Sequence, residues 1–298
     1  MDTPYIAHLE PTPLPWDRAL PSHQQPHHSS LPRTFLDAMS VREQVYVQEQ
    51  GIPQSNEFDS DDARSAHWVI YDAPAAANET VAAAARPSAS TAGGAATATS
   101  ETGGLVPVGT IRLVPFPHPP HPRDGGVYVD GELVDDAGDG QPEPRAAAAT
   151  ATSNATDHGA ATAPTGQPPF PADRPTTFHD GTEPYIKLGR LAVIPAFRGR
   201  GIAGQLIRAA LSWIAERPSY FDPNPETPRV DQSGTPPRWQ GLVCVHAQED
   251  AVKVWAKSGF VVDEGMGRWM EEGIPHVGMF LRVPLAGDGR GNGEAKQG

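Results

Sequence analysis

Hydrophobic and polar positions alternate or recur at helical spacing over well-defined stretches of the chain. Leu188, Leu191 and Val193 have the spacing of a strand that Pro195 ends, because proline fixes φ and has no N–H to donate. The apolar positions that follow recur every three to five residues on one face: Ile202, Leu206, Ala210, Leu211 and Ile214. This pattern predicts a helix that Pro218 closes.

The same criteria predict the other elements. An amphipathic helix is expected over 33–50 and a shorter helix within 249–260. Strand patterns occupy several further stretches: 65–72, 106–116, the residues from 185 onward, 241–248, 260–265 and 273–283. Together these elements place the chain in the α/β (α+β) class.

Composition separates this patterned sequence from long segments that lack a hydrophobic pattern. The 298 residues include 33 Pro and 30 Gly and only 7% aromatic residues, which is typical of a small core diluted by low-complexity sequence. We expect one domain over 33–285, interrupted by disordered insertions at about 73–104, 117–182 and 219–238. Flexible tails are expected at 1–32 and 286–298. Short strands are compatible with the sequence at 5–10 and 127–134.

Net charge and cysteine content limit the expected binding partners and the expected cellular compartment. A net charge of −13 disfavours nucleic acid, whose phosphates attract basic surfaces. Cys244 is the only cysteine, so an intramolecular disulfide is impossible and a reducing compartment is expected. No apolar run approaches the roughly 18 residues of a membrane span, and the acidic, Pro-rich start does not resemble a secretory signal. We therefore predict an intracellular, cytoplasmic protein without a membrane partner, whose oligomeric state the sequence does not indicate.

Two groups of side chains suggest metal binding or nucleophilic chemistry at first sight. His23, His27 and His28 lie close together, but no cysteine or acidic residue stands at ligand spacing, which favours a flexible His-rich tract. Cys244 lies in the middle of an apolar strand, where a free cysteine is usually a small buried hydrophobe. The sequence therefore predicts no metal and no cysteine nucleophile.

The loop that joins the strand near 190 to the long helix carries the strongest chemical signal. Residues 198–201 read Arg-Gly-Arg-Gly and lead into a helix N-terminus, whose first N–H groups and dipole attract phosphate. Gly199, Gly201 and Gly204 match the dinucleotide pattern GxGxxG, but Pro195 interrupts the strand and no second strand ending in an acidic residue follows. A P-loop would need Gly-Lys followed by Ser or Thr. A helix cap with two solvated arginines is the remaining alternative.

The same residues resemble a known family. Residues 198–203, Arg-Gly-Arg-Gly-Ile-Ala, are similar to the acyl-CoA pyrophosphate loop of the GNAT superfamily of N-acyltransferases, and 191–195 is similar to its central strand. Residues 109–113 resemble the third strand, while 41–72 and 246–279 resemble ElaA-type members. The resemblance implies the GNAT fold, a mixed and mostly antiparallel sheet flanked by helices, with acetyl-CoA as co-substrate.

The resemblance also implies which residues bind the donor. The diphosphate is expected on the loop and helix start: Arg198, Gly199, Arg200, Gly201, Ile202 and Ala203. The pantetheine arm is expected along the backbone of Leu191, Ala192 and Val193, where a main-chain N–H can also stabilise the thioester oxygen as it becomes negative. Gln248 stands where the family often has an Asn that contacts the CoA arm.

Catalysis requires that the attacking amine lose a proton, because an alkyl ammonium has a pKa near 10. Glu49 and Asp59, in the region that lies over the acceptor site in GNAT folds, are candidate proton acceptors; Glu57 and Asp62 are alternatives. His276 is a third candidate, and His246 is similarly placed to relay a proton. A histidine satisfied by neighbouring backbone is the competing interpretation for both. Trp255 replaces the tyrosine that often protonates the CoA thiolate, and an indole N–H is too weak an acid for that role.

These observations predict an N-acetyltransferase that moves the acetyl group of acetyl-CoA to a primary amine by direct attack in a ternary complex. A small amine and a protein amine are both possible acceptors, and an amino sugar is a third because a related closing segment occurs in glucosamine-phosphate acetyltransferases. The alternative function is a non-catalytic acyl-CoA-binding or scaffold protein with the same fold, in which Trp255 marks lost catalysis.

Overall fold

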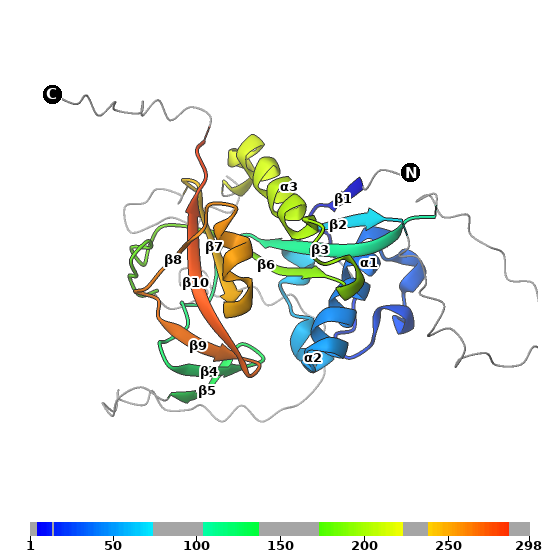
Figure 1. Ribbon diagram of the computed structural model, residues 1–298, viewed down its shortest axis with the longest axis horizontal. Coiled ribbons are helices and arrows are strands. Elements are labelled where there is room, and N and C mark those ends of the chain that lie inside the picture. Colours follow the sequence, from blue (N-terminus) through cyan, green and yellow to red (C-terminus); the bar gives the residue numbers. More distant parts are fainter. Residues whose placement is uncertain (1–4, 14, 74–103, 137–172, 223–237, 286–298) are drawn as a thin grey trace, which may run out of the picture.

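The computed structural model describes residues 5–13, 15–73, 104–136, 173–222 and 238–285. Its strands form one ten-stranded sheet in the order β1-β2-β3-β6-β7-β10-β9-β4-β5, with β8 paired to β10 (Figure 1). The strands are β1 (Tyr5–Leu9), β2 (Ala66–Asp72), β3 (Val106–Val114), β4 (Gly126–Val129), β5 (Glu132–Asp136), β6 (Ile186–Val193), β7 (Leu242–Gln248), β8 (Val261–Val262), β9 (Arg268–Glu271) and β10 (Ile274–Arg282). Neighbours are antiparallel except for β6–β7 and β4–β9, so the mixed, mostly antiparallel sheet is confirmed.

Helices flank this sheet. They are α1 (Arg33–Arg42), α2 (Gln54–Glu57), α3 (Ile202–Glu216) and α4 (Val252–Ala256). The helix predicted over 33–50 changes its winding partway: Glu43–Glu49 is π-helical, and Gln50 N–H donates to the carbonyl of Val45, five residues earlier, at 3.1 Å. Short 3₁₀ turns join the elements: Ser22–Gln24, His28–Ser30, Asp62–Arg64, Pro195–Phe197, Pro218–Phe221 and Glu249–Ala251.

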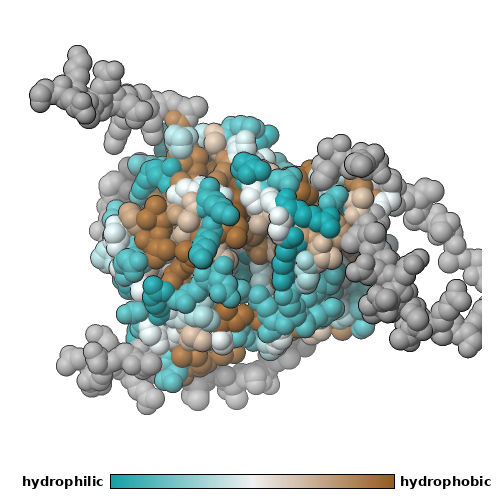
Figure 2. Space-filling model, viewed as in Figure 1, coloured by the Kyte–Doolittle hydropathy of each residue, from teal (hydrophilic) through white to brown (hydrophobic). Residues whose placement is uncertain are grey.

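Alternate side chains of β2 point to opposite faces of the sheet, and different helices cover these two faces. Trp68 and Ile70 lie in the large core with α3 and α4, whereas Val69 and Tyr71 lie in a second core under α1. In the space-filling view, hydrophilic residues cover the region of α2, whereas hydrophobic residues gather over β8 and β10 (Figure 2). Val261 of β8 is 54% exposed.

The expected flexible tail at 1–32 is wrong for its described residues. β1 pairs antiparallel with β2 along its whole length, and His8 stacks on Trp68 with ring centroids 4.5 Å apart. Trp16 lies edge-on against Phe35 at 5.0 Å and so joins the core under α1. The aromatic residues of this Pro-rich segment find partners only through tertiary packing, which local composition does not show.

The insertion expected at 117–182 is likewise not disordered throughout. β4 and β5 form a hairpin around Asp130 and Gly131, both at positive φ, and β4 pairs in parallel with β9. Residues 118–125 and 173–183 also lie against the sheet, because the rings of His121 and His179 pack on Phe280 of β10 with centroids 5.7 and 6.2 Å away. The central parts of the insertions, 74–103, 137–172 and 223–237, and the tail 286–298 lie outside the described residues.

Two boundaries near the end of the chain differ from the sequence pattern. The strand expected at 260–265 is reduced to β8, and β9 was not predicted. β9 turns into β10 through Glu272 and Gly273, with φ of 52° and 76°, the geometry of a tight two-residue hairpin. Among the described helices, none combines the length and the apolar character that crossing a bilayer requires.

Candidate functional site

The parallel strands β6 and β7 separate in the middle of the sheet. Their pairing covers three residues and ends at Leu188 and Val245. Directly afterwards β6 bulges against β3, and Arg190 adopts a φ of 49°. A bulge bends its strand and increases the twist, and Figure 1 shows β6 and β7 running apart. We call the region beyond Leu188 and Val245 the fork.

Backbone polar groups of β6 face the fork. The N–H of Ile194 donates to β3 at 3.0 Å, so the N–H and C=O of Val193 point the other way. Arg198 Nε donates to the Val193 carbonyl at 2.9 Å, and Tyr46 OH donates to the Leu191 carbonyl at 2.9 Å. The Val193 N–H therefore points to the side on which β7 no longer pairs, where it can donate to an extended amide or to an oxyanion.

Two side-chain amides bridge the end of the fork. Gln248 is the last residue of β7, and Gln50 follows the π-helical segment. They exchange two hydrogen bonds, at 3.1 and 3.0 Å, across 198 residues of sequence. A ligand that hydrogen-bonds to the Gln248 amide would have to displace Gln50 from it.

The loop after β6 leads into α3 with the expected strained geometry. Gly199 and Gly201 have φ of 77° and 76°, in the left-handed region that favours glycine. A Cβ at either position would meet no atom within 4 Å, so the loop is open on that side. No side chain caps the N-terminus of α3, which leaves its first N–H groups and the positive end of its dipole directed out of the helix. This arrangement suits a phosphate group.

Both loop arginines already have acidic partners. Arg198 holds Glu49 with two nitrogen–oxygen contacts at 2.6 and 2.5 Å. Arg200 lies over the Phe197 ring at 4.7 Å, and its Nη1 is 3.9 Å from a carboxylate oxygen of Asp72. The hydrogen bond from Arg198 lowers the pKa of Glu49, so this predicted proton acceptor is an ionised partner of the glycine loop and a weak base.

Asp59, the second predicted acceptor, belongs to a charged network that we define as Arg42, Arg112, Arg190, Glu57, Asp59 and Asp62. Arg112 contacts Asp59 at 2.6 Å, and Arg190 contacts it at 3.0 Å. Burial alone would raise the pKa of Asp59, but these two guanidinium groups lower it to about 2. Such a carboxylate is a poor base near neutral pH, so its geometry favours a structural role.

Glu57 and Asp62, the alternative acceptors, are buried in the same network. Arg42, which has no exposed surface, binds Glu57 at 2.6 Å through Nε and Asp62 at 2.6 Å through Nη1. Arg112 contacts Asp62 at 2.7 Å. The network therefore fixes α1 and the loop around α2 against β3 and β6.

His276 lies beside the end of the fork. It pairs in register with Gln248 on one side and Trp269 on the other. Its Nδ1 is 2.8 Å from the Ile274 carbonyl, which requires Nδ1 to carry the proton and leaves a lone pair on Nε2. Burial lowers the pKa of His276, with nearby Glu271 acting in the opposite direction, so the ring is neutral near pH 7. Among the three predicted proton acceptors, His276 is therefore the one whose ring nitrogen can accept a proton near pH 7.

Two residues at the site were not predicted. Tyr46 reaches Leu191 of β6 across 145 residues, and burial raises the pKa of its hydroxyl, which therefore stays protonated. Glu271 stands near His276; burial would raise the pKa of Glu271, but His276, Lys187 and Arg190 lower it. The tyrosine and acidic residue types are visible in the sequence, but their positions follow from the packing of α1 and the β9–β10 hairpin.

Two further residues occupy the core. Trp255 is 3% exposed and lies 5.2 Å from the Phe260 ring in the core with α3. Cys244 is fully buried, and burial raises the pKa of its thiol to about 12, so it is not a nucleophile near neutral pH.

Comparisons of the fold identify similar solved structures. They include a protein from Lactobacillus plantarum assigned as an N-acetyltransferase, with 16% identity, 95% of this chain and 100% of that chain covered, and a TM-score of 0.42. An acyl-CoA N-acyltransferase from Pseudomonas aeruginosa has 14% identity, coverage of 93% and 99%, and a TM-score of 0.41. ElaA from Escherichia coli also has 14% identity, coverage of 93% and 99%, and a TM-score of 0.41. No curated protein matches the sequence.

The family comparison concerns the site itself. Residues 168–222 match the model of the acetyltransferase (GNAT) family. The matched range contains β6, the glycine loop and the whole of α3, which form one side and one end of the fork. The match agrees with the expected resemblance: residues 168–222 of this chain are similar to the acetyltransferase (GNAT) family.

Proposed function

We propose that the protein transfers an acetyl group from acetyl-CoA to a primary amine by direct attack within a ternary complex. The observation that carries this proposal is the uncapped N-terminus of the 15-residue helix α3, which opens beside the fork. An acyl-CoA needs an anion site for its diphosphate and an adjacent polar edge for its amide-containing arm. Both lie on consecutive residues of this chain.

The donor is bound by backbone more than by side chains. The diphosphate accepts hydrogen bonds from the first N–H groups of α3 at Ile202 and Ala203 and from the loop before them. The arm runs along Leu191–Val193, and Gln248 turns from Gln50 toward it. Arg198 contributes positive charge, shared between the diphosphate and Glu49.

The carbonyl of the thioester becomes negatively charged during attack. A backbone N–H on the fork side of β6, for which Val193 has the required orientation, donates to this oxygen. The amine nitrogen then forms a bond to the carbonyl carbon, and the bond to the CoA sulfur breaks. The thiolate leaves without full protonation if its pKa resembles the value of about 8.5 for cysteine.

The proton of the amine passes to Nε2 of His276. Its Nδ1 is engaged by the Ile274 carbonyl, which fixes the tautomer, and the nearby carboxylate of Glu271 stabilises the imidazolium that forms. The same carboxylate attracts a cationic substrate, so we expect a protonated primary amine as the form that first binds. Glu49 and Asp59 have supporting roles in this scheme.

Release of free CoA thiol tests this function. The protein with acetyl-CoA and a panel of small amines, amino sugars and peptides should release thiol in proportion to acetylated amine. The double variant Arg198→Glu with Gly201→Asp should retain its circular dichroism spectrum and lose CoA binding. Arg217→Ala is the matched control, because Arg217 is also an exposed arginine with an acidic neighbour but lies at the other end of α3. Unchanged CoA affinity in the double variant would refute the phosphate assignment.

A second function is favoured by one observation. Trp255 is a buried core residue at the position where the family often has an acidic tyrosine, which suits an acyl-CoA-binding or scaffold protein without turnover. Saturable CoA binding with no thiol release on any amine would support this alternative and reject the transferase.

A further inference from the structure

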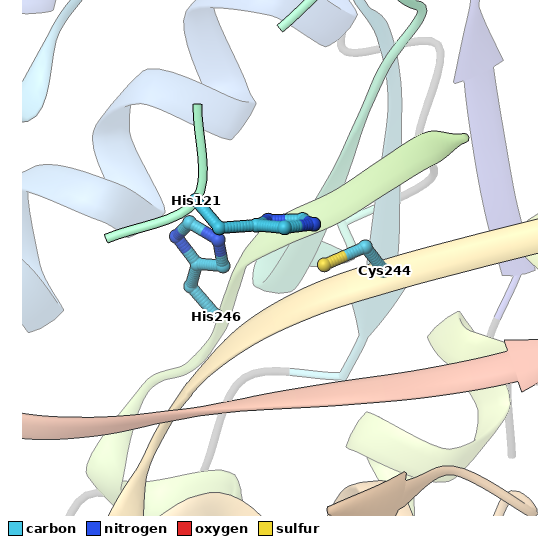
Figure 3. Close-up of side chains that lie close together, drawn as sticks. All are labelled: His121, Cys244 and His246. Atoms are coloured by element: carbon cyan, nitrogen blue, oxygen red, sulfur yellow. The ribbon is translucent and has the colours of Figure 1, made fainter. Parts of the chain in front are cut away.

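A group of polar side chains that the proposed reaction does not use lies on the face of β7 opposite α3. Val243, Val245 and Ala247 face the core with α3, so the alternate residues Cys244 and His246 point to the other face. His121, in the segment between β3 and β4, covers them. Figure 3 shows these three side chains converging, and one ligand atom from each lies within 4.8 Å of the other two.

A chain of hydrogen bonds sets the orientation of His121. His179 Nε2 is 2.9 Å from the Glu183 carbonyl, so this nitrogen carries a proton. In the neutral ring, His179 Nδ1 is then an acceptor, and His121 Nε2 donates to it at 2.9 Å. Burial and neighbouring His179 lower the pKa of His121 to about 3, so its ring is neutral and Nδ1 is left with a lone pair. That is the form of histidine that binds metals.

Two ring nitrogens of this group have no hydrogen-bond partner among the described residues. They are His121 Nδ1 and His246 Nε2, and both atoms are buried. His121 is 3% exposed and Cys244 has no exposed surface. A buried imidazole nitrogen without a partner is costly and calls for an explanation. Two such nitrogens beside a buried thiol share one explanation, a ligand that accepts lone pairs from all three.

We propose that His121, Cys244 and His246 bind a divalent transition-metal ion, with Zn²⁺ as the ion that fits best. Two imidazoles and a thiolate are the nitrogen and sulfur ligands that Zn²⁺ prefers, whereas Mg²⁺ and Ca²⁺ prefer oxygen. Ligand atoms around a tetrahedral zinc ion lie roughly 3.3–3.8 Å apart, given bonds of about 2.0–2.3 Å, so the three ligand atoms, which lie within 4.8 Å of one another, need to approach by at most about 1–1.5 Å. On binding, the Cys244 S–H bond breaks, its proton passes to solvent, and a sulfur–metal bond forms without any redox change.

Residues behind His121 complete the arrangement. Asp173 Oδ2 is 3.4 Å from His121 Nε2, and Asp173 Oδ1 accepts the backbone N–H of His121 at 2.8 Å. A carboxylate behind a metal-binding histidine holds the ring in place and raises its basicity. His121, Asp173 and His179 also lie close together, but their nitrogens already share a hydrogen bond, so this second group is the weaker candidate for a metal.

The metal would act as a structural clip. His121 and Asp173 stand on either side of residues 137–172, and Cys244 and His246 belong to the central strand β7. An ion between them ties the segments at 118–125 and 173–183 to the sheet. This inference is independent of acyl transfer, and it replaces the expectation of a protein without metal.

Measurements of bound metal and the absorption spectrum of the cobalt form test whether this metal site exists. Full-length protein, stripped with a chelator and reloaded with Zn²⁺, should retain stoichiometric zinc after desalting and melt at a higher temperature than the stripped form. Replacement by Co²⁺ should produce a thiolate-to-cobalt charge-transfer band in the near ultraviolet. Cys244→Ser should remove that band and weaken zinc binding more than about 100-fold, beyond the loss typical of outer-shell changes.

Two further variants locate the ion. His118→Asn removes a partly buried histidine from the same segment and should leave zinc binding unchanged. Asp173→Asn should weaken it by roughly 10–100-fold. Zinc that persists in Cys244→Ser but disappears in His179→Asn would place the ion in the second group and overturn the proposal. Wild-type protein that retains no metal, or a cobalt form without the charge-transfer band, would overturn it as well, whether or not the serine variant folds.

Discussion

At the scale of single residues, tertiary contacts determine which ionisable side chains can accept a proton from the amine. Glu49, Asp59 and His276 were equal candidates for the proton acceptor, but two of them bind arginines and one has a lone pair on an imidazole nitrogen. Residue type alone could not separate them, because a carboxylate and its arginine partner can lie 149 positions apart, as Glu49 and Arg198 do.

The first prediction concerns His276. His276→Asn should lower kcat by roughly 10²–10⁴-fold, the range for loss of a general base, while the KM for acetyl-CoA stays within a factor of a few. Steady-state kinetics at saturating amine measure both. His8→Asn, which alters a partly buried histidine on β1, is the control and should keep kcat. A normal kcat in His276→Asn would remove this residue from the mechanism.

The second prediction concerns the Arg198–Glu49 pair. Arg198→Ala should weaken CoA binding by about 10–100-fold, the equivalent of one charge-assisted hydrogen bond of about 1.5–3 kcal/mol. Glu49→Gln should have the opposite sign and tighten binding, because the carboxylate competes with the diphosphate for the same guanidinium. Titration calorimetry with CoA at constant ionic strength measures both. If Glu49→Gln weakens binding as much as Arg198→Ala, the pair acts as one unit and competition is excluded.

At the scale of elements, the charged network joins α1 and the α2 loop to two central strands. Arg42→Met leaves Glu57 and Asp62 buried without their main partner, and loss of one member of a buried ion pair costs about 3–5 kcal/mol. Urea unfolding should show this decrease. Arg33→Met is the control, since Arg33 also pairs with an aspartate but its side chain is 76% exposed; its effect should stay below about 1 kcal/mol.

The network also predicts the response to acid. The pKa of Asp59 is about 2 in the folded protein, against about 3.9 when unfolded. A depressed folded pKa means that the unfolded state binds more protons, so its contribution to stability is full above about pH 4 and is lost as the pH falls toward about 2.

Urea midpoints measured between pH 5 and pH 2.5 test this response. Asp59→Asn should lose part of the decline in stability that the wild type shows below pH 4, while titrations shared by the two proteins cancel. Parallel curves for the two proteins would contradict a structural role for this carboxylate.

At the scale of the whole molecule, segments that look like appendages take part in the fold. β1 completes one edge of the sheet, where Tyr5 stacks on Tyr71 at 4.8 Å and His8 stacks on Trp68. The β4–β5 hairpin completes the other edge, while His121 before it covers β7 and His179 after it packs on Phe280 of β10. The described parts of the N-terminal segment and of the insertion at 117–182, which a minimal domain would omit, therefore complete the edges of the sheet and cover one of its faces.

Truncation of the N-terminal segment tests whether β1 contributes to stability. Deletion of residues 1–13 should lower the free energy of unfolding by about 1–3 kcal/mol, because two aromatic pairs of about 0.5–1.5 kcal/mol each are lost along with strand pairing. Deletion of residues 1–4, which stops short of β1, should leave the thermal midpoint unchanged. Equal midpoints for the two deletions would show that β1 adds nothing to stability.

The sequence by itself determined the parts that depend on local pattern. The strand spacing of Leu188–Val193, the two glycines that tolerate positive φ and the long apolar face of α3 are properties of consecutive residues, and they specify a strand, a glycine turn and a helix start. Tertiary structure decided everything that depends on distant residues meeting: the release of β6 from β7 at a bulge, the arginine partners of Glu49 and Asp59, and the meeting of Tyr46 with Leu191. It also brought His121 to Cys244 and His246 across 123 and 125 positions. Hydrogen bonds and metal ligation need atoms within a few ångströms, and for residues so far apart in sequence only the folded sheet sets that distance.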